Sequence, residues 1–224
     1  DGEGFIASDV PAILQYTSNV YYIGNLELAK VSKEEITFYN LDGEEIQKKM
    51  KTVDWDAEAA EKAGFEHFMM KEIHEQPRAV KDTLNSVLKD GKIDLTDIGL
   101  AEEDIRRTSQ IYIVACGSAY HVGMVAQYVI EDLVKIPVRV ELASEFRYRK
   151  PILDPNGLAI IISQSGVTAD SLAALRETKA QGIRTLGIVN VVGSSIAREA
   201  DKVFYTLAGP EISVATTKAY STQL

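Results

Sequence analysis

The stretch IIISQSGVTADSLAALRETKAQG, residues 160–182, combines three structural signals in succession. Its apolar start is typical of a buried strand, and residues 168–181 have the pattern of a helix. The turn between them, residues 163–168, is rich in hydroxyl groups and contains neither Lys nor Arg. A strand that passes through one short turn into a helix predicts a unit of an alternating β/α fold.

The same alternation continues on both sides of this stretch. We expect strands at residues 111–115, 138–142, 158–163, 184–190 and 202–207. We expect helices or helical turns at residues 119–134, 144–148, 168–181 and 195–200. Strands that alternate with helices predict an α/β fold, a doubly wound parallel sheet with right-handed crossovers.

The first part of the chain has a different character. Residues 1–55 are β-rich, with strands expected at residues 12–17, 20–23, 26–31 and 35–40. Asp42-Gly43 predicts a hairpin turn, because Gly tolerates a positive φ. Residues 54–64 are acidic and rich in Ala, which indicates a linker or a short helix. The predicted domains are therefore residues 1–55, a linker at 56–66, and residues 67–224.

Residues 65–88 have helical periodicity, and Pro77 is expected to kink or divide that helix. A polar connection follows, with a short helix at residues 102–107.

Charge and composition exclude several function classes. The net charge is −9, so neither a nucleic acid nor an anionic membrane is expected as a partner. The single cysteine, Cys116, excludes an intrachain disulfide and favours a reducing compartment, so we expect a cytoplasmic protein. No apolar run approaches the roughly 20 residues of a membrane span. The chain starts without Met and without a signal-peptide pattern, as expected of a fragment.

Two polar turns are predicted where ligands of open α/β sheets bind, beyond the carboxyl ends of strands. They are residues 116–119 and 163–168, and each precedes a helix whose N-terminal N–H groups favour an anion. Gly117 and Gly166 allow a close approach of the backbone, and the hydroxyls of Ser163, Ser165 and Thr168 can donate to phosphate. The alternative is a capped turn, since Ser and Thr are common N-caps.

Neither G-x-x-x-x-G-K-S/T nor G-x-G-x-x-G after a strand occurs, which favours a monophosphate over ATP or a dinucleotide. No cofactor is expected. His67, His74 and His121 lack metal-ligand spacing, so no metal site is expected either. Cys116 has no evident base partner and is interpreted as a substrate contact rather than a nucleophile. Lys218 is interpreted as a solvated side chain near a helix start.

The segment SQSGVTADSLAAL, residues 163–175, resembles the signature of sugar isomerase (SIS) domains, in which S-x-S-G-x-T cradles a sugar phosphate. Further segments resemble the glutamine–fructose-6-phosphate aminotransferase family: EGFIASDVPAIL, HFMMKEIHEQP, ACGSAYHVGMVAQY, ASEFRYRKP, NVVGSSIARE and GPEISVATTKAYSTQL. The resemblance covers nearly the whole chain.

This resemblance implies a flavodoxin-like three-layer αβα fold for the first SIS subdomain, preceded by the end of an Ntn-type glutaminase domain. It implies synthesis of glucosamine 6-phosphate and glutamate from fructose 6-phosphate and glutamine, by a homodimer. The substrate-binding residues that it implies are Cys116, Gly117, Ser118, Ser163, Gln164, Ser165, Thr168, Val214 and Thr216. Ser118 stands where Thr is common, and Ala119 stands where Ser is common.

The glutaminase nucleophile and the second SIS subdomain, with its base, Schiff-base lysine and ring-opening histidine, are expected outside this chain. We therefore expect no catalytic residue here and no turnover by this chain alone. Two alternatives are a regulatory SIS-domain sugar-phosphate sensor and a related deglycase or phosphosugar isomerase. The β-rich, acidic start disfavours the sensor, and the glutaminase-like segment GFIASD disfavours the deglycase or isomerase.

Overall fold

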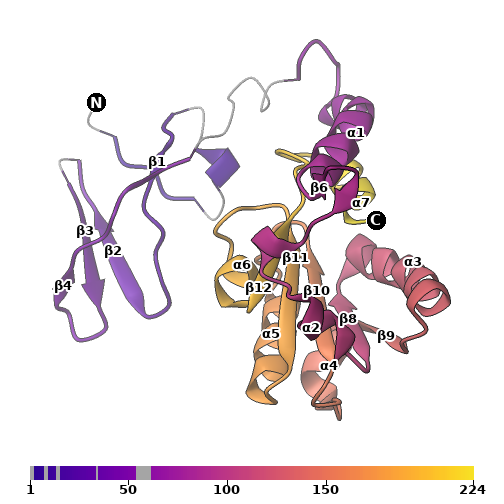
Figure 1. The fold of residues 1–224 in the computed structure, drawn as a ribbon. Helices are drawn as coiled ribbons and strands as arrows, with labels where there is room; N and C mark the ends of the chain where they lie inside the picture. Colours follow the sequence, from indigo (N-terminus) through magenta and orange to yellow (C-terminus); the bar gives the residue numbers. More distant parts are fainter. Residues whose placement is uncertain (1–2, 8–9, 14–15, 34, 54–61) are drawn as a thin grey trace. The chain divides into compact units, whose positions relative to one another are not determined.

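The structure is a computed structural model that describes the chain except residues 1–2, 8–9, 14–15, 34 and 54–61 (Figure 1). The chain divides into two compact units, Asp1–Gly64 and Phe65–Leu224. Most of the linker predicted at residues 54–64 falls outside the described residues.

The first unit contains short antiparallel strands. β2 (Glu27–Val31), β3 (Ile36–Asn40) and β4 (Glu45–Ile46) form one sheet, and β1 (Asn19–Val20) pairs with β5 (Lys51–Thr52). The predicted hairpin turn is confirmed: Gly43 has φ +80°, and its N–H donates to the carbonyl of Asn40 at 3.1 Å.

Two strand predictions in this unit are wrong. The strand expected at residues 12–17 is absent from the described part of that range, since residues 14–15 lie outside the described residues. Ala12 ends a 3-10 turn, η1 (Val10–Ala12), and the N–H groups of Ile13 and Tyr16 donate to the carbonyls of Val10 and Ile13 instead of to a neighbouring strand. The strand expected at residues 20–23 ends at Val20, and β1 pairs with β5 only through Asn19 with Thr52 and Val20 with Lys51.

The second unit is built on five parallel strands: β8 (Ile111–Ala115), β9 (Val138–Leu142), β10 (Leu158–Ser163), β11 (Arg184–Val189) and β12 (Lys202–Tyr205). Their order in the sheet is β12-β11-β10-β8-β9, the flavodoxin-like arrangement. The predicted α/β class is therefore confirmed. The order reverses between β8 and β10, and ligands of such sheets bind at this reversal, beyond the carboxyl ends of the strands.

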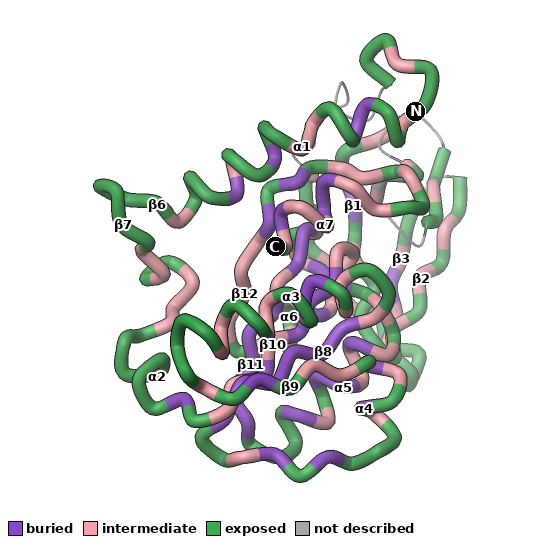
Figure 2. Tube along the Cα trace, turned by 90° about the vertical axis from the view of Figure 1, so that its right-hand side faces the viewer, coloured by how far each residue is buried: buried purple, intermediate pink, exposed green. Residues whose placement is uncertain are grey.

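The helices form a layer on each side of the sheet. Successive strand residues point to opposite faces, so the sheet contributes to one core on each side. Tyr112 and Val114 pack in one core with residues of α4 (Ala143–Arg149), α5 (Ala169–Ala180) and α6 (Ser195–Glu199). Ile113 and Ala115 pack in the other core with α3 (Gly117–Val134) and α7 (Lys218–Gln223). Figure 1 shows α3 and α5 on opposite sides of the strands, and Figure 2 shows buried residues concentrated along β8 and β10.

α1 (Phe68–Asn85) precedes the sheet and packs beside α7 (Figure 1). Pro77 was expected to kink or divide this helix, and the helix is not divided, because it continues through Pro77 to Asn85. Proline has no N–H to donate to the carbonyl of Ile73. The side-chain amide of Gln76 donates to that carbonyl instead, at 3.1 Å.

The connection from α1 to the sheet contains a hairpin that was not predicted, β6 (Leu88–Lys89) with β7 (Lys92–Ile93). A 3-10 turn, η3 (Thr96–Ile98), and the predicted short helix, α2 (Glu102–Arg106), follow it.

Candidate binding site

The turn after β10 is held together by its own side chains. The hydroxyl oxygen of Ser163 accepts the N–H of Gly166 at 3.0 Å and lies 3.0 Å from the hydroxyl of Thr168. The hydroxyl oxygen of Ser165 accepts the N–H of Val167 at 3.3 Å, which leaves its hydrogen free to donate elsewhere. Hydrogen bonds within residues 163–168 therefore shape the inside of this turn.

Gly166 allows this turn to pack tightly. Its φ is +65°, in the left-handed region that favours glycine. A Cβ at this position would lie 2.0 Å from the hydroxyl oxygen of Ser194, a buried residue just before α6. The carbonyl of Gly166 also accepts the N–H of Ile196, at 2.9 Å. The turn and the start of α6 are thus in direct contact.

The turn after β8 lies beside the turn after β10. Cys116 occupies the N-cap position of α3, and its Sγ is 3.9 Å from the hydroxyl of Ser171 in α5. Gly117 begins α3 with φ +56°. The two turns predicted to share one edge of the sheet therefore do so, with the N-termini of α3 and α5 directed to the same place.

A third segment, residues 209–217, completes the site. One carboxylate oxygen of Glu211 accepts the hydroxyl of Thr216 at 2.7 Å, and the other accepts the N–H groups of Thr217 at 2.8 Å and Ala219 at 3.2 Å. Glu211 therefore fixes both Thr216 and the start of α7. This carboxylate was not predicted, because a Glu six residues before the N-cap Thr217 belongs to no standard capping motif.

Asn190, at the end of β11, joins this segment to the turn after β10. Its side-chain amide donates to the carbonyl of Gly209 at 2.8 Å, and its side-chain oxygen accepts the N–H of Ala208 at 3.0 Å. Its own N–H donates to the carbonyl of Gln164, at 3.1 Å. One buried side chain thus connects two parts of the site.

These elements enclose a pocket of about 240 Å³. Its lining residues are Cys116, Ser118, Ala119, Ile162, Ser163, Gln164, Ser165, Thr168, Ser171, Glu211, Ser213, Val214, Thr216 and Gln223. All predicted site residues except Gly117 are among them, and Ser171, Glu211, Ser213 and Gln223 were not predicted. Among the described lining residues, hydroxyls predominate and no Lys or Arg occurs. Such a lining can hold a small, highly oxygenated ligand by hydrogen bonds and helix N-termini.

Two charged side chains, Lys218 and Arg147, form ion pairs within the fold. Lys218 is buried, and its Nζ lies 2.6 Å from the carboxylate of Glu75, so the prediction of a solvated side chain is wrong. The packing of α7 against α1, which local sequence does not reveal, buries Lys218.

Arg147 is paired with Asp170 at 2.7 Å, and that hydrogen bond raises the pKa of the Arg147 guanidinium. Within the described part of the chain, no group of acidic, Cys or His side chains could hold a metal ion.

None of the helices in the described ranges has the length and apolar character needed to span a bilayer.

The fold and the pocket agree with the comparison to known families. The SIS domain family matches residues 104–224, more than half of the chain, so the chain belongs to the SIS domain family. Two curated relatives are enzymes of the same name. It is 56% identical, over its whole length, to glutamine–fructose-6-phosphate aminotransferase (isomerizing) of Caldanaerobacter subterraneus subsp. tengcongensis. It is 57% identical, over 98% of its length, to the enzyme of that name from Clostridium acetobutylicum.

A solved structure supports the same relationship. The C-terminal domain of glucosamine-fructose-6-phosphate aminotransferase from Francisella tularensis matches 73% of this chain with a TM-score of 0.70 and 49% identity, and 46% of that domain is covered. The resemblance seen in the sequence is thus confirmed. The chain spans 37% and 36% of the length of the two curated relatives named above.

Proposed function

We propose that this chain is the sugar-phosphate-binding part of a glutamine–fructose-6-phosphate aminotransferase, which makes glucosamine 6-phosphate and glutamate from fructose 6-phosphate and glutamine. The observation that supports this most is the hydroxyl-lined pocket at the reversal of strand order, in a chain 56% identical throughout to such an enzyme.

The phosphate binds at the turn after β10. Ser165 donates its free hydroxyl hydrogen, Gln164 and Thr168 contribute polar groups, and the N-terminus of α5 supplies backbone N–H groups and the positive end of the helix dipole. Ser163 shapes the turn as well as lining the pocket. The charge of the phosphate is then offset without a cationic side chain.

The sugar extends toward the turn after β8 and the segment 209–217. Cys116, Gly117, Ser118 and Val214 contact it through side chains or main chain. Because the hydroxyl of Thr216 donates to Glu211, its oxygen remains an acceptor, suited to a sugar hydroxyl rather than to phosphate. The two ends of the pocket thus have opposite hydrogen-bonding polarity, which orients the ligand.

In the whole protein, residues 1–55 end a glutaminase domain that releases ammonia from glutamine, and residues 67–224 form the first SIS subdomain. Groups outside this chain perform the chemistry, and the enzyme is a cytoplasmic homodimer. The chain needs no cofactor or metal and does not bind nucleic acid. By itself it binds sugar phosphate but completes neither half-reaction.

Isothermal titration of the chain with fructose 6-phosphate, fructose and inorganic phosphate tests this proposal. We expect binding of fructose 6-phosphate, weaker binding of inorganic phosphate, and no heat with fructose, because the phosphate provides the main anchor. An ammonia-dependent synthesis assay is expected to give no product. Equal binding of fructose and fructose 6-phosphate would contradict a phosphate-binding site in this pocket. Product formation by the chain alone would contradict the assignment of the chemistry to groups outside it.

A further inference from the structure

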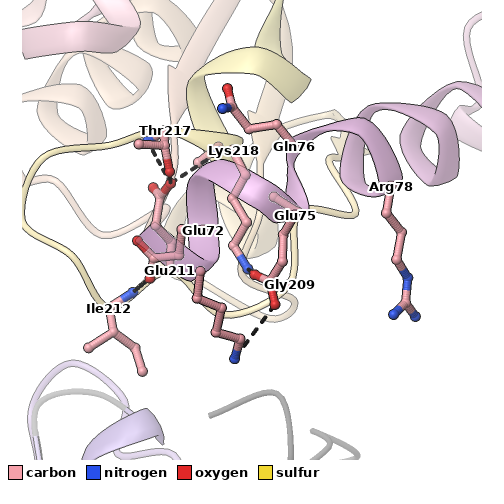
Figure 3. Close-up of polar contacts among 12 residues, drawn as sticks. Glu72, Glu75, Gln76, Arg78, Gly209, Glu211, Ile212, Thr217 and Lys218 are labelled. Atoms are coloured by element: carbon pink, nitrogen blue, oxygen red, sulfur yellow. Dashed lines mark hydrogen bonds and ion pairs between the residues drawn. The ribbon is translucent and has the colours of Figure 1, made fainter. Parts of the chain in front are cut away.

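A buried carboxylate on α1 contacts the wall of the pocket from outside it. Glu72 is only 2% exposed, and its Oε1 accepts the N–H groups of Ile212 at 2.6 Å and Ser213 at 3.2 Å (Figure 3). Glu72 does not line the pocket, whereas Ser213 does. It also lies outside residues 104–224, the part that the SIS family matches.

The segment that Glu72 holds has no regular structure of its own. Residues 209–217 lie between β12 and α7 and form neither helix nor strand. Their first residues are fixed by the bond from Asn190 to Gly209, and their last residues by Glu211. Between these ends Val214 is fully exposed, so little packing restrains the backbone there. The two bonds to Glu72 therefore restrain the middle of the segment.

Other residues of α1 hold the flanks of this segment. The hydroxyl oxygen of Thr83 accepts the N–H of Leu207 at 2.9 Å, just before the segment. After it, Lys218 donates to Glu75 at 2.6 Å, as Figure 3 shows. The helix thus forms a continuous support along the segment from β12 to α7.

The chemistry of Glu72 indicates a specific role rather than helix packing. A buried carboxylate is destabilising unless hydrogen bonds offset the loss of hydration. Within the described residues, Oε2 has no hydrogen-bond partner, so the two amides accepted by Oε1 provide the main compensation. An apolar side chain would pack there without this cost but would leave both N–H groups without an acceptor.

We propose that Glu72 is a positioning residue for the ligand site. By accepting the N–H groups of Ile212 and Ser213, it holds the middle of the 209–217 segment, residues 211–216, in the shape that contacts the sugar. The α1 helix is then a functional part of the binding site, although it lies outside the SIS-family match. This inference rests on the proposed function for the identity of the ligand.

Three variants of the whole chain test it. Glu72→Met fills the volume but removes the acceptor, Glu72→Gln keeps an acceptor at the same reach, and Arg78→Ala changes an exposed residue of α1 whose side chain points away from the segment (Figure 3). We expect Glu72→Met to weaken binding of fructose 6-phosphate roughly ten-fold, as loss of two hydrogen bonds to a binding wall implies. Glu72→Gln should stay within about three-fold of the parent chain, and Arg78→Ala should be unchanged.

Inorganic phosphate distinguishes positioning from general destabilisation. Phosphate needs the turn after β10 but not the 211–216 wall, so its affinity should remain within about two-fold in Glu72→Met. Equal weakening for phosphate and fructose 6-phosphate, or unchanged binding of both, would overturn the proposal. If Glu72→Met does not fold, Glu72→Asp replaces it, because the shorter carboxylate withdraws from the two amides.

Hydrogen exchange separates this inference from the proposed function. The amides of Ile212 and Ser213 should exchange at least ten-fold faster in Glu72→Met than in the parent chain or in Arg78→Ala, with no ligand present. If the parent chain fails to bind fructose 6-phosphate while these amides accelerate, the proposed function is wrong and the support by Glu72 remains. If the amides exchange at the parent rate, the support by Glu72 is wrong whatever the ligand.

Discussion

Two walls of one pocket are built in different ways. The turn at residues 163–168 is stabilised from within, by bonds such as the one from Gly166 to Ser163, three residues apart. The segment at residues 209–217 depends on distant residues, above all Glu72, 140 residues before Ile212. The first wall is therefore shaped mainly by bonds within its own sequence, whereas the second depends mainly on contacts with α1 and with Asn190. Substitutions in the two walls should accordingly have different consequences for stability and for binding.

The largest effect is expected where the local wall meets α6. Gly166→Ala places a Cβ 2.0 Å from the hydroxyl oxygen of Ser194 at φ +65°. Steric overlap and an unfavourable backbone conformation together should lower the free energy of unfolding by about 3 kcal/mol and abolish binding of fructose 6-phosphate. Urea unfolding and isothermal titration measure the two effects.

Gly193→Ala is the matched control, because Gly193 also has a positive φ, +73°, but a Cβ there meets nothing within 4 Å in the described structure. It should cost only about 1 kcal/mol. Adding Ser194→Gly to Gly166→Ala should recover the steric part of the loss. Equal costs for the two glycine variants would show that the turn and α6 are not in tight contact.

The second effect concerns the residue that joins the two walls. Asn190→Ala removes the partners of two backbone groups, the buried N–H of Ala208 and the partly buried carbonyl of Gly209, and should lower the free energy of unfolding by about 2 kcal/mol. Affinity for fructose 6-phosphate should fall about ten-fold, because the 209–217 wall loses its anchor. Asn156→Ala serves as control and should change neither quantity, because Asn156 is exposed and lies just before β10, at the amino ends of the strands. Loss of stability with unchanged affinity would mean that the walls act independently.

This difference between local and distant contacts also explains what could be predicted from the sequence. The five strands of the second unit were predicted because short runs rich in apolar and β-branched residues, such as residues 111–115, lie between recognisable polar turns. Ser163, Ser165 and Thr168 were placed at the pocket because their motif is local. Val214 and Thr216 came only from the family resemblance, since nothing in their own surroundings indicates a site.

Two of the errors have the same physical origin. Lys218 was taken as solvated, but it is buried by a helix that lies far away in the sequence. Glu72 was not recognised as a support of the pocket wall, because its partners are 140 residues away. Tertiary contacts decide these two cases, and periodicity does not report them. The helix that continues through Pro77 differs, because the bond from Gln76 to the carbonyl of Ile73 is a local contact within α1.

A smaller effect is expected for a hydroxyl of the local wall that shapes little of the turn. Ser165→Ala removes a hydroxyl that is free to donate, so affinity for inorganic phosphate and for fructose 6-phosphate should fall three- to ten-fold. The free energy of unfolding should change by less than about 0.5 kcal/mol, because the lost bond is exposed. Ser163→Ala is the contrasting variant: it removes the buried acceptor of Gly166 and should reduce both stability and affinity. If both variants behave alike, the turn is not shaped by Ser163.

The smallest effect on binding is expected at the amino ends of the strands, away from the pocket, where Asp201 joins the start of β11 to the start of β12. Its carboxylate accepts the N–H of Thr185 at 2.9 Å, the hydroxyl of Thr185 at 2.8 Å and the ammonium of Lys179 at 2.8 Å. Burial by itself would raise the pKa of Asp201, but the hydrogen bonds from Lys179 and Thr185 outweigh it and lower the pKa.

Because the folded pKa lies below the unfolded value of about 4, the ionised carboxylate stabilises the fold above pH 4, and this contribution disappears as the pH falls through the folded pKa. Asp201→Asn should therefore lower the free energy of unfolding by about 1 kcal/mol at pH 7, a modest amount because solvent screens a partly exposed pair, and by progressively less below pH 4. Urea unfolding from pH 3 to pH 7 measures this difference. Affinity for fructose 6-phosphate at pH 7 should stay within two-fold, since neither wall contacts Asp201. A larger change in affinity would show that the amino and carboxyl ends of the strands are coupled. The turn at residues 163–168 would then depend on the rest of the fold.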